Sequence, residues 1–146
     1  MKVNITQFPT TLEGYVNVNT TEHSITNLNG VCQDAECTEI IAQVLDYVHA
    51  HKLVPTLKGW VSKLRHGGVL VIGGTDILEV SRGVVNGTIN IADANRAFFG
   101  AVDMGSYIKS SAFNCAEICT ILKEIGLVVD KKRINGNEFV VEAHRD

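Results

Sequence analysis

The sequence predicts an α/β protein with a mostly parallel sheet, and three features of the chain lead to this fold class. Short apolar segments of strand character alternate with longer segments in which apolar residues recur at helical spacing. One apolar segment, VLVIGG at 69–74, is uninterrupted, as is typical of a parallel strand buried on both faces. The chain closes with two alternating segments around NGN at 135–137, a strong hairpin signal. We therefore expect a mostly parallel sheet flanked by helices, with one reversed edge strand from the closing hairpin.

Four strands are predicted in the first third of the chain. The segments KVNI at 2–5 and GYVNVN at 14–19 alternate apolar and polar residues, and TQFPTTLE connects them. GVCQDA at 30–35 is interpreted as a short third strand. Residues 39–42 form the fourth, which changes to a helical pattern around 44–48.

Helices are predicted between and after the later strands. The clearest spans 51–68, because its apolar residues recur every three or four positions, and Gly67 and Gly68 are expected to end it. Three further helices are predicted at 77–87, 91–105 and 110–126, the last capped by Ser110 or Ser111 and ended by Gly126.

At 146 residues the chain has the size of one domain, 1–146, and its bulk properties argue against several functions. Its net charge of −3 gives no reason to expect nucleic acid or an anionic membrane as a partner. No apolar run approaches the ~18 residues of a membrane helix, and the polar start MKVNITQF is unlike a secretory signal, so a cytoplasmic location is expected. The expected partner is an unidentified small molecule or protein, and the edge strand of the hairpin could support a homodimer.

The cysteines do not predict a metal site. Their spacing matches that of paired thiolate ligands only loosely, and two of them lie one helical turn apart beside an apolar face. Small buried side chains are the simpler interpretation of Cys32, Cys37, Cys115 and Cys119.

Several polar residues near strand ends also have ordinary structural interpretations. His49 and His51 are expected on different sides of a helix, at its exposed end. Asp46 is assigned a packing and surface role. Asp76 lies at the carboxyl end of the VLVIGGTD strand at 69–76, where it either caps the following helix or faces a substrate.

Three segments resemble the class I S-adenosylmethionine-dependent methyltransferases. LKGWVSKLRHGGVLVIGGTD is similar to the family's helix–Gly-Gly–strand segment, commonly written vLkPGG-l-v-i. CTEIIAQVLDYV resembles the preceding D-E-I…vLEH run, and EGYVNVN resembles the second strand, G-Y/W-V-N-V-D, of compact members. The likeness spans nearly the whole chain and implies a Rossmann-like methyltransferase sheet that ends in an antiparallel hairpin.

The resemblance also assigns cofactor-binding positions, two of which depart from the family's pattern. The glycine-rich loop after the first strand is replaced by Thr6, Gln7 and Phe8. The acidic residue that accepts hydrogen bonds from both ribose hydroxyls is replaced by Asn19, whose carboxamide has one accepting oxygen and a competing donor. The helix that usually separates the first two strands is also missing.

Other positions match the family. Asp34 matches the acidic position that binds the adenine amino group, although a turn or capping role is an equal alternative. Gln43 and Val44 match the border of the methionine end of the site. Tyr47 and Asp76 are the candidates on the substrate side.

Two functions remain open. The altered loop and Asn19 favour a degenerate methyltransferase-fold protein that binds S-adenosylmethionine weakly or not at all and serves as a binding or assembly module. The alternative is an active methyltransferase of a small molecule or macromolecule with an atypical cofactor loop, because methyl transfer needs alignment more than acid–base groups. No catalytic residue is assigned. If Phe8 projects above the end of the first strand, it fills the methionine position.

Overall fold

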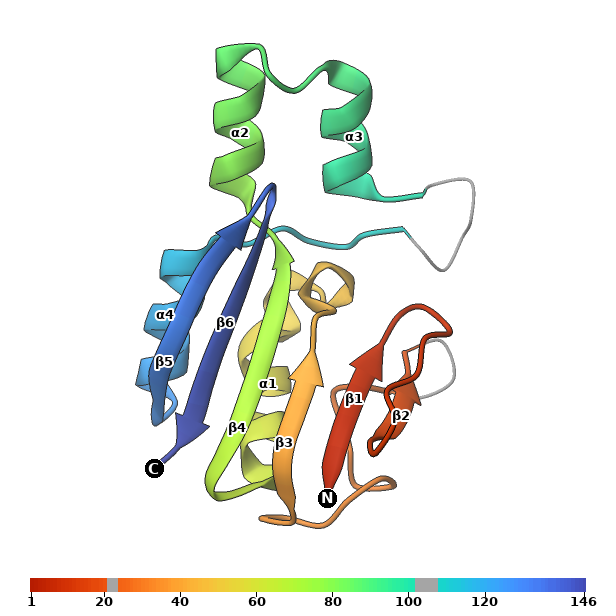
Figure 1. The fold of residues 1–146 in the computed structure, drawn as a ribbon, viewed down its shortest axis with the longest axis vertical. Helices are drawn as coiled ribbons and strands as arrows, with labels where there is room; N and C mark the ends of the chain where they lie inside the picture. The colour runs from red at the N-terminus through yellow and green to blue at the C-terminus, as the bar shows by residue number, and fades with distance from the viewer. Residues whose placement is uncertain (21–23, 102–107) are drawn as a thin grey trace.

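The computed structural model describes residues 1–20, 24–101 and 108–146, and these residues form a six-stranded sheet with four α-helices (Figure 1). The strands run in the order β2-β1-β3-β4-β6-β5. Their bounds are β1 (Lys2–Thr6), β2 (Val16–Asn19), β3 (Cys37–Ala42), β4 (Leu64–Thr75), β5 (Leu127–Asn135) and β6 (Glu138–Arg145).

The predicted mixed sheet is confirmed, with one correction to the place of the reversed strand. The pairs β1–β2, β1–β3 and β3–β4 are parallel, whereas β4–β6 and β5–β6 are antiparallel. The reversed strand is β6, and it lies inside the sheet because its far side pairs with β4. The edge strand of the hairpin is therefore β5, which carries Lys131, Lys132 and Arg133. Charges of this kind discourage strand addition at an edge.

The helices fall into two groups (Figure 1). The first group, α1 (Leu53–Lys63) and α4 (Cys115–Glu124), lies behind the sheet, whereas α2 (Ile77–Asn86) and α3 (Ile91–Phe99) stand beyond the carboxyl end of β4. Two 3-10 turns, η1 (Leu45–Tyr47) and η2 (Ala50–Lys52), connect β3 to α1. In the described part of the chain, no helix has the length and apolar character needed to cross a membrane.

Two elements predicted on either side of β3 differ from those in the structure. The strand expected at 30–35 is absent; this segment forms turns, and Ala35 has a left-handed φ of 57° that a regular strand does not allow. The helix expected over 51–68 ends at Lys63, and β4 begins at once, so Gly67 and Gly68 lie within the strand. A Cβ atom on Gly68 would lie 2.8 Å from the Arg65 carbonyl oxygen, so glycine permits the irregular register between β3 and β4 here.

Helix α4 begins later than expected because another residue caps it. The Asn114 side chain accepts a hydrogen bond from the Glu117 N–H, which makes Asn114 the N-cap. Ser111 instead donates its hydroxyl to the carbonyl oxygens of Leu45 and Val48. Helix α3 ends at Phe99, and the rest of the helix predicted to 105 lies largely outside the described residues.

The hydrophobic core occupies one face of the sheet. Alternate residues of neighbouring strands are aligned by the register, so that Ile5, Ala42, Ile72 and Val141 form one buried row. This row and the parallel row through Val3, Ile40, Leu70 and Ala143 belong to one buried cluster with residues of α1 and α4, namely Leu53, Leu57, Trp60, Ile118 and Leu122.

The opposite face of the sheet carries no described helix (Figure 1). Here the register aligns Asn4, Ile41, Val71, Glu142 and Lys131, a row in which Ile41 and Val71 are only half-buried. The prediction that the 69–74 segment is buried on both faces is therefore wrong. Parallel sheets are usually covered on both sides, and this sheet is an exception within the described residues.

A buried carboxylate joins the segments above the carboxyl end of β4. Asp46, expected at the surface, is buried in η1, and its oxygens accept hydrogen bonds from the Thr75 N–H at 2.7 Å and the Thr75 hydroxyl at 2.9 Å. Lys109 Nζ lies 3.1 Å from Asp46 Oδ2 and also donates to the Ala97 carbonyl oxygen. A Cβ atom on Gly74 would lie 2.8 Å from Asp46 Oδ1, so glycine is required for this approach. The network thus joins η1, β4, α3 and the segment before α4.

One-sided burial predicts that neighbouring β4 residues contribute unequally to stability. Ile72→Ala should lower the free energy of unfolding by about 2–5 kcal/mol, because it leaves a cavity among fully buried side chains. Val71→Ala should cost less than about 1 kcal/mol, because its side chain is partly hydrated already. Urea unfolding followed by the emission of Trp60 measures both values. Equal losses would show that the second face is also covered.

The Asp46 network predicts a large cost for removing its carboxylate. Asp46→Ala leaves Lys109 and the Thr75 donors without their acceptor in a buried site, and we expect a loss of about 3 kcal/mol in the free energy of unfolding. Glu124→Ala, which removes an exposed carboxylate at the end of α4, should change it by less than about 0.5 kcal/mol. Chemical denaturation of the two variants side by side gives the comparison. If they are equally stable, the buried network does not hold these segments.

Candidate functional site

The carboxyl ends of β1, β2 and β3 meet at one end of the sheet, and two cavities open there. The first, here the strand-end cavity, has a volume of about 510 Å³ and lies between the ends of β1 and β2, the η1–η2 segment and the residues before α4. It is lined by Gln7, Thr20, Ser24, Ile25, Thr26, Tyr47, Val48, His49, Lys52, Ile108 and Ser110.

The second cavity, here the sheet-face cavity, has a volume of about 490 Å³ and follows the uncovered face along β1 and β3. Gln7, the residue directly after β1, lines both cavities and is buried. The remaining lining residues are Asn4, Ile5, Thr6, Phe8, Thr10, Leu12, Ile41, Gln43, Val44 and Glu138.

The loop after β1 is closed by its own hydrogen bonds. The Thr6 hydroxyl accepts the Phe8 N–H at 3.2 Å and lies 2.9 Å from the Phe8 carbonyl oxygen and 3.1 Å from the Thr10 hydroxyl. The Thr10 N–H donates to the Phe8 carbonyl oxygen at 2.7 Å, and Pro9 has no N–H. The N–H groups of residues 8 and 10 are therefore used within the loop. None of residues 6–10 has a positive φ for which glycine would be needed, and the first glycine after β1, Gly14 with a φ of 81°, lies shortly before β2.

The structure brings six of the seven predicted cofactor positions, all but Asp34, to the same end of the sheet. Thr6 and Asn19 are register partners at the ends of β1 and β2, and the Thr20 N–H extends this pairing by donating to the Thr6 carbonyl oxygen. Phe8 lines the sheet-face cavity and is 49% exposed. Gln43 lines the same cavity from the end of β3.

The other candidates at this end differ in their exposure. Val44 is buried in the core while it borders the sheet-face cavity, whereas Tyr47 is half-buried and lines the strand-end cavity. Asp76 is the N-cap of α2: its Oδ1 accepts the N–H groups of Leu78 and Glu79, and its Oδ2 accepts that of Cys115. The capping interpretation of Asp76 is thus confirmed.

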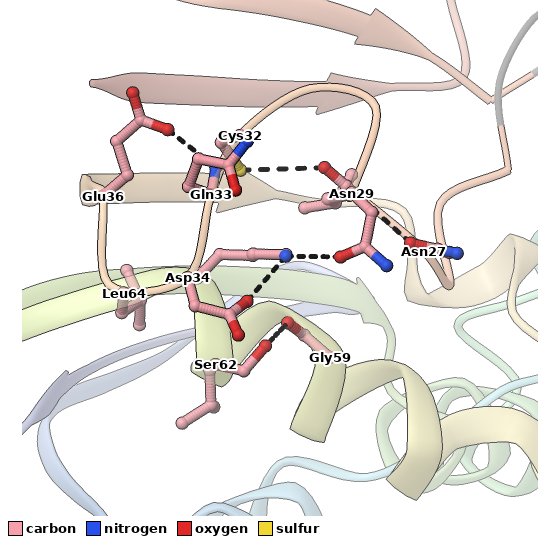
Figure 2. A network of polar contacts seen from close by, with 12 residues as sticks. Asn27, Asn29, Cys32, Gln33, Asp34, Glu36, Gly59, Ser62 and Leu64 are labelled. Atoms are coloured by element: carbon pink, nitrogen blue, oxygen red, sulfur yellow. Dashed lines mark hydrogen bonds and ion pairs between the residues drawn. The ribbon is translucent and has the colours of Figure 1, made fainter.

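Asp34 lies apart from the other candidates, at the amino end of β3 (Figure 2). Its carboxylate contacts Lys63 Nζ at 2.7 Å, and Asn29 accepts a hydrogen bond from the same ammonium group. The Lys63 side chain is 6% exposed and that of Asp34 is 77% exposed, so Asp34 satisfies a buried charge near the end of α1. The sequence match misplaced Asp34, because residues 30–35 form turns before β3 and no strand carries them to the cavity end.

Of the eleven described residues that line the strand-end cavity, all but Gln7 and Tyr47 were not among the predicted site residues, and three of these are Thr20, His49 and Lys52. Thr20 follows β2, and His49 and Lys52 lie between β3 and α1. The general rule that residues beyond the carboxyl ends of parallel strands face ligands could have identified them. The expectation that His49 and His51 point to different sides of a helix is wrong, because His49 is the N-cap of the 3-10 turn η2, His51 lies within that turn, and their rings stack with centroids 5.7 Å apart.

The cysteines are core residues in two pairs. Burial, and secondarily the neighbouring Cys32, raises the pKa of Cys37 to about 12. Burial and the neighbouring Cys119 raise the pKa of Cys115 to about 11. Thiols with such values are protonated at neutral pH and are poor nucleophiles and ligands. Within residues 1–20, 24–101 and 108–146, no three His, Cys, Asp or Glu side chains cluster as metal ligands would.

Comparison with known proteins identifies the fold. No protein-family model and no curated protein matches the sequence. Among solved structures, a SAM-dependent methyltransferase from Methanosarcina mazei superposes with a TM-score of 0.60 at 14% identity, over 90% of this chain and 66% of that one. A possible histamine N-methyltransferase from Thermotoga maritima gives 0.59 at 15% identity, over 91% and 65%.

A third similar structure, from Burkholderia thailandensis, contains two bound molecules. It is a 1,6-didemethyltoxoflavin-N1-methyltransferase with 1,6-didemethyltoxoflavin and S-adenosylhomocysteine, and it gives a TM-score of 0.56 at 11% identity, over 90% of this chain and 52% of that one. This chain thus spans about half to two thirds of the length of these three proteins. Most of the chain has the α/β fold of the class I S-adenosylmethionine-dependent methyltransferases.

Proposed function

We propose that this chain is a degenerate methyltransferase-fold protein that binds S-adenosylmethionine weakly or not at all and serves as a binding or assembly module. The loop after β1 is the observation that carries the proposal. The fold's cofactor site relies on a loop whose bare backbone approaches the ligand. Here the Phe8 and Thr10 N–H groups are already bonded within the loop, and Pro9 offers none.

Two further observations support the same proposal. At the end of β2, Asn19 takes the place of the carboxylate that would hold the ribose hydroxyls. Asp34, the candidate for the adenine contact, pairs with Lys63 at the opposite end of the sheet. Because methyl transfer depends on binding and alignment of the cofactor, the loss of these contacts removes most of what the protein would contribute to the reaction.

One observation favours the alternative, an active methyltransferase. The sheet-face cavity lies against Thr6, Phe8 and Gln43, and it contains the carboxylate of Glu138 from the closing hairpin. A carboxylate near the β1 loop could accept hydrogen bonds from the cofactor or balance its positive charge. In that case Glu138 would replace the missing acidic residue at Asn19.

A thermal-shift titration with S-adenosylmethionine and S-adenosylhomocysteine separates the two functions. A ligand at about 100 times its dissociation constant stabilises the native state by about 2.7 kcal/mol, which raises the Tm of a domain of this size by several degrees. We expect a shift below about 1 °C at about 1 mM of either compound, because the loop offers them few donors.

The matched variants are Glu138→Gln in the sheet-face cavity and Glu124→Gln on the exposed surface of α4. A saturable shift of several degrees in the native chain, lost in Glu138→Gln and kept in Glu124→Gln, would contradict the degenerate function and establish a cofactor site at Glu138. Calorimetric titration of the same variants gives the dissociation constants directly.

A further inference from the structure

The strand-end cavity has a cationic lining. Among its eleven described lining residues are a lysine, Lys52, and a histidine, His49, and none carries a carboxylate. The other lining groups are hydroxyls, an amide, a phenol and apolar side chains. A cavity with this composition attracts negative charge and has no acidic group of its own to satisfy a cation.

Among the described residues, the acidic side chain closest along the chain to Tyr47 and His49 does not cancel this charge. The carboxylate of Asp46 is turned toward Thr75 and Lys109, which use both of its oxygens. Lys52 has no ion-pair partner among the described residues, and the first turn of α1, directly after it, contains no acidic side chain. The positive end of the α1 dipole therefore adds to the potential of Lys52.

A buried hydroxyl in the same cavity lacks a partner. Thr20 Oγ1 is inaccessible to solvent and has no hydrogen-bond partner among the described residues. Buried polar atoms are almost always hydrogen-bonded, and Thr20 Oγ1 and Thr56 Oγ1 are the two exceptions among the described side chains, of which only Thr20 belongs to the cavity lining. Ser24 and Thr26, which line the same cavity, bond to each other at 3.0 Å.

We propose that the strand-end cavity binds a small organic anion, whose carboxylate or phosphate group contacts Lys52 and His49 beside the wall that contains the Thr20 hydroxyl. The apolar side chains of Ile25, Val48 and Ile108 contact the uncharged part of the molecule. This proposal deepens the proposed function and rests on it in one respect: the strand ends are taken as a binding site that is not specific for S-adenosylmethionine. The sulfonium and ammonium groups of that cofactor would be repelled by Lys52.

The single tryptophan reports on this cavity. The Trp60 indole N–H donates to the carbonyl oxygen of Ile25 at 2.7 Å, and Ile25 is part of the cavity wall. Trp60 itself is fully buried, so its emission responds to changes in this wall and not to ligand quenching at the surface. Occupancy of the cavity should therefore shift the Trp60 emission of the native chain.

The experiment is a calorimetric titration of the full chain with phenyl phosphate, benzoate and the uncharged benzyl alcohol, repeated with Trp60 emission. At least one anion should bind with a dissociation constant of about 1 mM or lower and shift the emission, and benzyl alcohol should bind at least about tenfold more weakly. The tighter of the two anions identifies phosphate or carboxylate as the preferred group.

The variants locate the anion. Lys52→Gln should weaken binding by about fivefold or more, and His49→Gln should also weaken it, since both remove a cationic or donor group from the cavity. Lys58→Gln, which removes an exposed lysine of α1 outside the cavity lining, should change the affinity by less than about twofold. Circular dichroism confirms that each variant is folded.

Three results would overturn the proposal: no binding heat with either anion up to about 10 mM, equal binding of benzyl alcohol, or equal effects of Lys52→Gln and Lys58→Gln. Failure here is distinct from failure of the proposed function. If S-adenosylmethionine binds while the anions do not, both proposals fail. If Lys52-dependent anion binding coexists with S-adenosylmethionine binding, only the degenerate function is wrong.

Discussion

The packing of this chain is governed by the fact that only one face of its sheet is buried. Helices α1 and α4 contribute Leu57, Trp60 and Leu122 to the same apolar layer as the inward residues of the four central strands β1, β3, β4 and β6. In the described residues, the other face has no second layer to match it. Two features are consistent with this arrangement. The connector between β1 and β2 contains no helix, and the two cavities open at the carboxyl ends of the strands, where the covered layer ends.

The two cavities differ in chemistry although they share Gln7. The sheet-face cavity adjoins the β1 loop and contains the carboxylate of Glu138, whereas the strand-end cavity contains Lys52 and His49. The fold thus keeps the usual place for a ligand, beyond the carboxyl ends of parallel strands. The Phe8 and Thr10 N–H groups of its loop are used internally, so these two donors are not available to a ligand.

The fold class could be predicted from the sequence because periodicity and the hairpin signal are local properties. The resemblance around CTEIIAQVLDYV and LKGWVSKLRHGG correctly predicted the order of β3, α1 and β4. Exposure of Val71 could not be predicted, because an apolar run has the same composition whether one or both faces are covered. The prediction that Gly67 and Gly68 end a helix was wrong for a similar reason, since glycine suits both a helix end and a bulged strand.

The positions of candidate site residues could be predicted only near strand ends. Thr6 and Asn19 end β1 and β2, and Gln7, Phe8 and Gln43 follow β1 or β3, as the resemblance to the family implied. Their binding of a cofactor stays a prediction. The predicted position of Asp34 was wrong because it required a strand at 30–35. The ion pair that Asp34 forms with Lys63, 29 residues away, cannot be recognised in any local sequence pattern. The roles of Asp46 and Lys52 likewise depend on contacts between distant segments.

The α2–α3 pair, which stands beyond the sheet, has a consequence for how the molecule fluctuates. No residue of α3 is buried, and α2 buries only Val80 and Gly83, while Val85 and Ile91 are 84% and 81% exposed. With so few buried contacts, the pair is a separate cooperative unit that opens at a lower free energy than the sheet. We therefore expect the amide hydrogens of α2 and α3 to exchange with solvent through local opening, and those of β3, β4 and β6 to exchange only through global unfolding.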